Sequence, residues 1–139
     1  MHKLHIKNDQ VSPEIILNPA ERLFIIQGVS APEDVRSLYY PVIEWLRLFV
    51  DDILQGEIKN FNKENPVRLQ IDLTYFNSSS AKFLYDILLE LKRLKGSDVP
   101  FVAEWIYEEE DLDMKDAGSD ISNLAEVEFL FTQKHKTRK

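Results

Sequence analysis

The chain has 139 residues, of which 44% are hydrophobic, and it carries a formal net charge of -7. This composition suits one domain with a single core, and the absence of cysteine excludes disulfide frameworks and thiolate metal sites. No apolar run is long enough for a signal peptide or a membrane helix, and the acidity disfavours binding to nucleic acid or anionic membranes. We therefore expect a cytoplasmic protein.

A β-hairpin is predicted near the N-terminus. Apolar segments at residues 14–17 and 22–27 flank Asn18-Pro19-Ala20-Glu21, which is a turn-forming tetrapeptide. Such a hairpin would add an antiparallel edge to a sheet formed by later strands.

A long amphipathic helix should follow this hairpin. Ser30-Ala31-Pro32-Glu33 fits a capping box with proline in the first turn. Apolar residues then recur with a helical period from Val35 to Ile53. Pro41 lies inside this pattern and cannot donate to the carbonyl of Ser37, so we expect a kink or two abutting helices there.

The clearest strand signal spans residues 67–75, after a polar loop. Five apolar residues point one way, namely Val67, Leu69, Ile71, Leu73 and Tyr75, and polar residues occupy the positions between them. Because a strand that is buried on both faces would be apolar throughout, this alternation predicts a sheet with one wet face. All large helices should then pack on the other face.

The C-terminal half continues with alternating elements. We expect a helix from the serines at 78–80 to about Lys95, a strand over 99–107, a short helix in the acidic segment 108–120 that ends near Gly118, and a last strand over 127–132. The resulting order, β-β-α-β-α-β-α-β, predicts a single α/β domain over residues 1–133 with a mixed sheet. Residues 134–139 are predicted to be a basic, disordered tail.

The junction at residues 72–80 is the strongest functional signal. A strand stops at three hydroxyl side chains, directly before an amphipathic helix. The unpaired N–H groups and positive dipole end of that helix would favour a phosphate there. A serine at this position can cap the helix, or carry nearly two negative charges when phosphorylated.

The element order and several motifs resemble the STAS domains of bacterial anti-sigma-factor antagonists, and more closely the SiaC-like regulatory phosphoproteins. The signature is carried by Thr74-Tyr75-Phe76-Asn77-Ser78-Ser79-Ser80-Ala81-Lys82. Ser12-Pro13-Glu14, Tyr40-Pro41-Val42-Ile43-Glu44-Trp45 and the segment from Trp105 to Met114 resemble three further family stretches. The resemblance covers nearly the whole chain except the basic tail.

This resemblance implies a STAS-like fold and a switch protein without catalysis or a cofactor of its own. A dedicated Ser/Thr kinase and a PP2C-like phosphatase would set its state, and the unmodified form would bind and activate a diguanylate cyclase in cyclic-di-GMP and biofilm signalling. The family's phosphoacceptor falls on Ser78, where its best-known members have threonine. Because three serines follow one another, Ser79 and Ser80 remain alternatives.

Other candidate partner-binding residues surround this junction. Asn77 would cap the helix or contribute to kinase recognition, Ser79 could contact a partner, and Lys82 lies within reach of a phosphate or of a partner's acid. The acidic run of Glu108, Glu109, Glu110 and Asp111 is interpreted as a docking patch that steers a basic surface. Mg²⁺ binding by these acids is disfavoured, because no glycine-bearing Ca²⁺-loop spacing is present.

Two other functions stay open. An anti-sigma-factor antagonist, binding a kinase-type anti-sigma factor, would use the same fold and switch, and gene neighbourhood would separate it from a cyclase regulator. An enzyme that uses the acidic segment with a metal is the third hypothesis, which a Mg²⁺ titration would test.

Overall fold

The computed structural model describes residues 1–135, in which six strands form one mixed sheet in the spatial order β1-β2-β3-β4-β5-β6. The strands are β1 (Leu4–Ile6), β2 (Glu14–Asn18), β3 (Leu23–Ser30), β4 (Val67–Phe76), β5 (Phe101–Glu108) and β6 (Phe129–Lys134). The pairs β1–β2 and β2–β3 are antiparallel, whereas β3 to β6 run parallel. The predicted hairpin and mixed sheet are confirmed, and β1 is an additional strand that the predicted order lacked.

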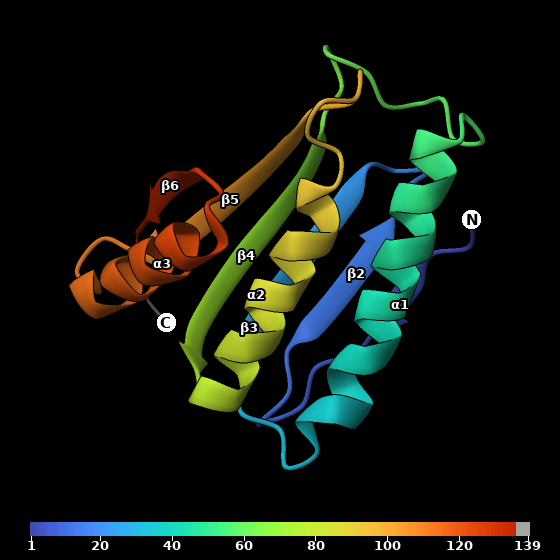
Figure 1. Cartoon of the computed structure of the whole chain (residues 1–139). Coiled ribbons are helices and arrows are strands. Elements are labelled where there is room, and N and C mark those ends of the chain that lie inside the picture. Colours follow the sequence, from blue (N-terminus) through green and yellow to red (C-terminus); the bar gives the residue numbers. More distant parts are fainter. Residues whose placement is uncertain (136–139) are drawn as a thin grey trace.

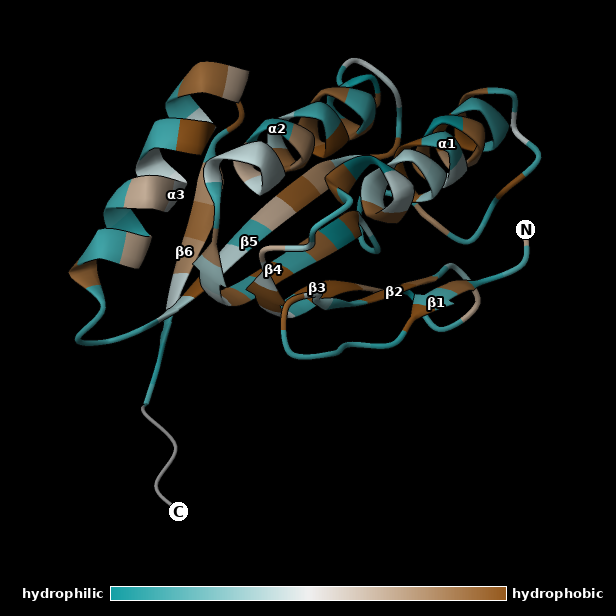
Figure 2. Ribbon diagram, turned by 90° about the horizontal axis from the view of Figure 1, so that it is seen from below, coloured by the Kyte–Doolittle hydropathy of each residue, from teal (hydrophilic) through white to brown (hydrophobic). Residues whose placement is uncertain are grey.

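Three helices connect the parallel strands, namely α1 (Val35–Leu54), α2 (Ser78–Lys92) and α3 (Leu112–Ala125). They all lie on one side of the sheet, as predicted, and α1 and α2 run side by side (Figures 1 and 2). Their apolar stripes and the inward-facing residues of the strands form one continuous core. No helix within residues 1–135 combines the length and the apolar character needed to cross a membrane.

The start of α1 differs from the prediction. The side chain of Asp34 caps the helix by accepting from the backbone N–H of Ser37, whereas Ser30 is the last residue of β3 and is fully buried. The helix continues through Pro41 without interruption, so two abutting helices are excluded. Ser37 and Pro41 are both exposed, so water can satisfy the carbonyl that proline leaves without a donor.

The predicted alternation of β4 holds from Val67 to Leu73 and then fails. Gly28 pairs with Leu73 and Val29 pairs with Tyr75, so Thr74 is an extra residue in β4 and forms a β-bulge. Beyond the bulge the faces exchange, which leaves Tyr75 54% exposed, contrary to its predicted inward orientation. Phe76 instead turns inward and packs edge-on against Trp105, with ring centroids 5.8 Å apart.

The C-terminal elements are shifted relative to the prediction. Helix α2 ends at Lys92, three residues early, and the prediction that a helix ends near Gly118 is wrong because Gly118 lies buried inside α3. A Cβ atom on Gly118 would lie 2.5 Å from the indole nitrogen of Trp105, so this glycine permits a close helix–strand contact. Lys134, the first residue of the predicted tail, closes β6, and residues 136–139 lie outside the described residues.

Candidate functional site

The β4–α2 junction has the predicted geometry. Asn77 adopts an extended conformation, and its side-chain oxygen accepts from the backbone N–H of Ser80 at 2.9 Å, which makes it the N-cap. Helix α2 therefore begins at Ser78, whose side chain is exposed in the first turn. A phosphate on Ser78 would lie at the positive end of the helix dipole.

The three consecutive serines have different environments. In the described part of the chain, the Ser78 hydroxyl makes no side-chain hydrogen bond, whereas the Ser79 hydroxyl donates to Asn77 Oδ1 at 3.1 Å. Ser80 is fully buried. A kinase could reach Ser78 or Ser79 in the folded protein, but it could not reach Ser80.

Ser80 belongs to a buried chain of hydroxyl groups that links α2, β3 and α1. Ser80 Oγ donates to the backbone oxygen of Ser30 at 2.9 Å and accepts from Ser30 Oγ at 2.8 Å. Because the Ser30 hydrogen is used in this way, the Tyr39 hydroxyl, 2.7 Å away, must donate to Ser30 Oγ. Burial raises the pKa of Tyr39 to about 12, so this donor stays protonated even at a pH where an exposed phenol ionises.

Lys82 lies one turn beyond Ser78 on the exposed side of α2. Its Nζ is 2.8 Å from a carboxylate oxygen of Asp86 and 4.8 Å from the ring centroid of Phe83. Helix positions four residues apart face each other, so Lys82 is a neighbour of both Ser78 and Asp86.

The acidic run forms the turn between β5 and α3. Glu108 ends β5, Glu109 and Glu110 are exposed, and Asp111 caps α3 by accepting from the backbone N–H of Met114 at 3.1 Å. The turn is tied to β6, because the Glu109 N–H donates to the Lys134 carbonyl at 3.0 Å. Asp111 therefore has a structural role, whereas Glu109, which lies 3.3 Å from His135 Nδ1, and Glu110 have exposed side chains.

Residues of the acidic turn share a cavity with residues of β4. A cavity of about 120 Å³ is lined by residues of β4, β5, β6 and the acidic turn: Asp72, Leu73, Thr74, Tyr107, Glu108, Asp111 and Lys134. The Nζ atom of Lys134 pairs with the carboxylate of Asp72 at 2.6 Å, and both residues line this cavity. Across the described residues, no three His, Cys, Asp or Glu side chains are grouped to hold a metal ion.

Sequence reasoning missed the supporting residues of this site. The sequence pattern predicts Ser30 as part of a helix cap and places Tyr39 within the apolar period from Val35 to Ile53, although both residues hold the first turn of α2 in place. Ser30 and Ser80 are 50 residues apart, and Asp72 and Lys134 are 62 apart. No local pattern signals such pairs.

Comparisons with known proteins identify the family of this chain. The family model described as SiaC family regulatory phosphoprotein matches residues 6–134. An uncharacterized protein of Pseudomonas aeruginosa strain UCBPP-PA14 is 31% identical over 108 residues, which cover 78% of each chain.

Two solved structures from Pseudomonas aeruginosa are similar over almost their whole length. Apo-SiaC has a TM-score of 0.77 and 26% identity, and the match covers 96% of this chain and 99% of that one. The second is a crystal structure of the diguanylate cyclase SiaD in complex with its activator SiaC, with a TM-score of 0.75, 26% identity and the same coverage.

Proposed function

Because this chain belongs to the SiaC family of regulatory phosphoproteins, we propose that it binds a diguanylate cyclase and controls it through reversible phosphorylation of Ser78. A Ser/Thr kinase transfers the γ-phosphoryl group of ATP to Ser78 Oγ, which loses its proton as ADP leaves. A PP2C-like phosphatase hydrolyses the phosphoester with water and releases inorganic phosphate. The protein itself catalyses neither step.

The observation that carries this proposal is the exposure of Ser78 at the start of α2. The cap is supplied by Asn77, so the Ser78 hydroxyl is free to accept a phosphoryl group without loss of the helix cap. The dianion would be favourable for α2 itself, because it lies at the positive end of the helix dipole. Phosphorylation should therefore change the surface and leave the fold intact.

The partner is proposed from the solved relatives. Pseudomonas aeruginosa SiaC forms a complex with SiaD as its activator, and this chain matches 96% of its own length to that protein. In our proposal the unmodified chain presents a neutral turn to the cyclase and activates it. Phosphorylation leaves a charge at that contact that is buried without its pair, which costs several kcal/mol, so the phosphorylated form dissociates.

The test measures cyclic-di-GMP formation by purified SiaD of Pseudomonas aeruginosa, and by the cyclase from this protein's own host, with and without the chain. The unmodified protein should raise the rate, and Ser78→Asp should raise it much less. Leu124→Asp, which puts the same charge on an exposed position of α3, is the matched control and should activate like the wild type. Equal activation by wild type and Ser78→Asp would refute the switch.

A further inference from the structure

A groove between α1 and α2 lies on the outer surface of the helical layer. It has a volume of about 520 Å³, and its apolar floor is formed by Tyr40, Ile43, Phe83 and Leu89. Tyr40 is 56% exposed and Leu89 is 37% exposed, although both are large apolar side chains on otherwise polar helix surfaces. Exposed apolar surface of this kind is typical of protein contacts.

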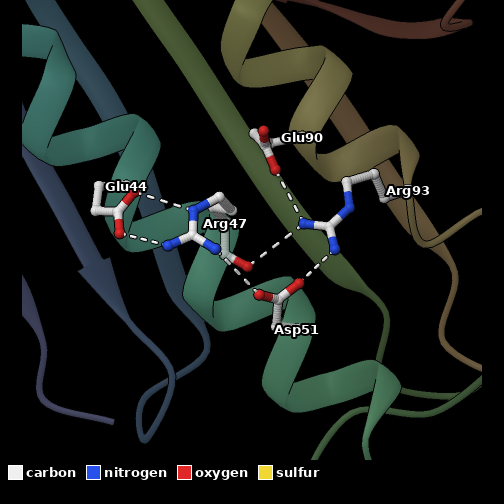
Figure 3. Close-up of polar contacts among 5 residues, drawn as sticks. All are labelled: Glu44, Arg47, Asp51, Glu90 and Arg93. Carbon is white, nitrogen blue, oxygen red and sulfur yellow. Dashed lines mark hydrogen bonds and ion pairs between the residues drawn. The ribbon is translucent and has the colours of Figure 1, made fainter.

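Three carboxylates also line this groove, and each is paired with a basic side chain of the same chain. Asp86 pairs with Lys82 at 2.8 Å, and Glu90 pairs with Arg93 at 3.0 Å. Glu44 likewise forms a two-pronged ion pair with Arg47 (Figure 3). The unmodified groove thus has an apolar floor and a rim of carboxylates, each of which is neutralised by a basic side chain.

The two walls of the groove are fixed relative to each other. Arg93, the C-cap residue of α2, contacts the carboxylate of Asp51 on α1 and donates to the backbone oxygen of Arg47 at 3.4 Å (Figure 3). Such a bridged pair of helices can receive a third helix with little reorganisation.

We propose that this groove docks an uncharged, apolar helix face of the cyclase, and that Lys82 couples it to phosphorylation of Ser78. This inference rests on the proposed function and names its contact surface. The charge balance of the rim supports an apolar occupant, since a strongly basic helix would have to displace Arg47, Lys82 and Arg93.

Lys82 supplies the coupling because it lies four residues from both Ser78 and Asp86. A phosphate dianion on Ser78 attracts Lys82 more strongly than one carboxylate does, and it draws Lys82 away from Asp86. Asp86 then has no counter-charge when an apolar surface covers the groove. Burying that unpaired charge weakens docking, which is the direction that the switch requires.

The first experiment measures the affinity of SiaD for groove variants by isothermal titration calorimetry. Leu89→Arg should weaken binding at least about tenfold, and Leu124→Arg, an exposed leucine on α3, should bind like the wild type. Wild-type affinity for Leu89→Arg would overturn the groove assignment. If the wild type fails to bind SiaD and its own host's cyclase, the proposed function fails as well.

The second experiment tests the coupling with a charge cycle. Lys82→Met should weaken binding about tenfold, because Asp86 loses its partner, and Lys82→Met with Asp86→Asn should restore it. Phosphoserine at position 78 in the double variant should then have a much smaller effect than in the wild type. A full effect of phosphoserine in the double variant would overturn the role of Lys82, while the proposed function would stand. Lys115→Met on α3, another lysine above an aromatic ring, is the control.

Discussion

The hydroxyl of Ser80 donates to the backbone oxygen of Ser30 at a distance of 2.9 Å, inside the protein. This bond joins the first turn of α2 to the end of β3, and a second bond from Asn77 N–H to the same oxygen at 3.0 Å strengthens the junction. The surface that carries Ser78 is therefore held on a rigid support. Ser80 therefore has a structural role, whereas Ser78, two residues earlier, is open to modification.

Replacing Ser80 with alanine should lower the free energy of unfolding by about 1–3 kcal/mol, because the buried Ser30 hydroxyl loses its hydrogen-bond acceptor and the Ser30 carbonyl loses one of its two donors. The measurement is urea denaturation followed by circular dichroism. Ser79→Ala is the control and should change stability by at most about 0.5 kcal/mol, since Ser79 is exposed. Equal stability of the two variants would contradict the buried chain of hydroxyls.

Ser78→Ala should abolish labelling of the protein by the proposed Ser/Thr kinase, and Ser79→Ala should retain it. Alanine at the first helical position leaves the Asn77 cap in place, so the variant should fold normally. The modified residue is identified by phosphopeptide mass spectrometry after incubation with the kinase and ATP. Labelling that persists in Ser78→Ala and disappears in Ser79→Ala would move the modified site by one residue.

Gly118→Ala should destabilise the protein by about 1–3 kcal/mol, through overpacking against Trp105. The expected destabilisation is opposite to the effect of intrinsic helix propensity, which alone would favour alanine over glycine by about 1 kcal/mol. Trp105 cannot yield easily, because it is buried and its indole N–H donates to the Met114 carbonyl at 3.0 Å. Thermal unfolding of Gly118→Ala, with the exposed Asp120→Ala as control, checks this. A stabilised Gly118→Ala would mean that the contact relaxes freely.

Stability should fall between pH 10 and 12 because of Tyr39. The pKa of its phenol is raised by burial from 10.0 to about 12 in the folded protein. In this range the unfolded chain has already released the proton that the folded chain retains, so rising pH favours unfolding, by at most about 1.4 kcal/mol per pH unit. Tyr39→Phe should start less stable at pH 8 and lose less stability up to pH 12. Parallel pH profiles of the two proteins would contradict this assignment.

Much of the fold was predictable because its signals are local. The alternation in β4 and the helical periods of α1 and α2 reflect which side of each element is buried. The spacing of apolar residues within each element reveals that side. Strand β1 was missed because it has three residues and gains its stability from pairing with β2. The reversal at Tyr75 depends on a bulge opposite Gly28, which no pattern within β4 reveals.

The site was predictable in part for the same reason. A run of hydroxyls between a strand and a helix marks the junction, and the resemblance to the SiaC family singles out Ser78 as its candidate for modification, with Ser79 and Ser80 as alternatives. The different environments of the three serines were not predictable. The burial of Ser80 depends on Ser30 and Tyr39, which reach the junction through the tertiary fold. Gly118 illustrates the same limit, since a helix terminator and a close packing contact both require glycine.

The most direct test of the central claim compares the affinity of a diguanylate cyclase for the chain carrying phosphoserine at position 78 and for the unmodified chain. The phosphorylated protein should keep the same circular dichroism spectrum and bind about a hundredfold more weakly or worse. Phosphoserine at position 79 should have a smaller effect. Equal affinity of the unmodified chain and the chain phosphorylated at Ser78 would contradict the account.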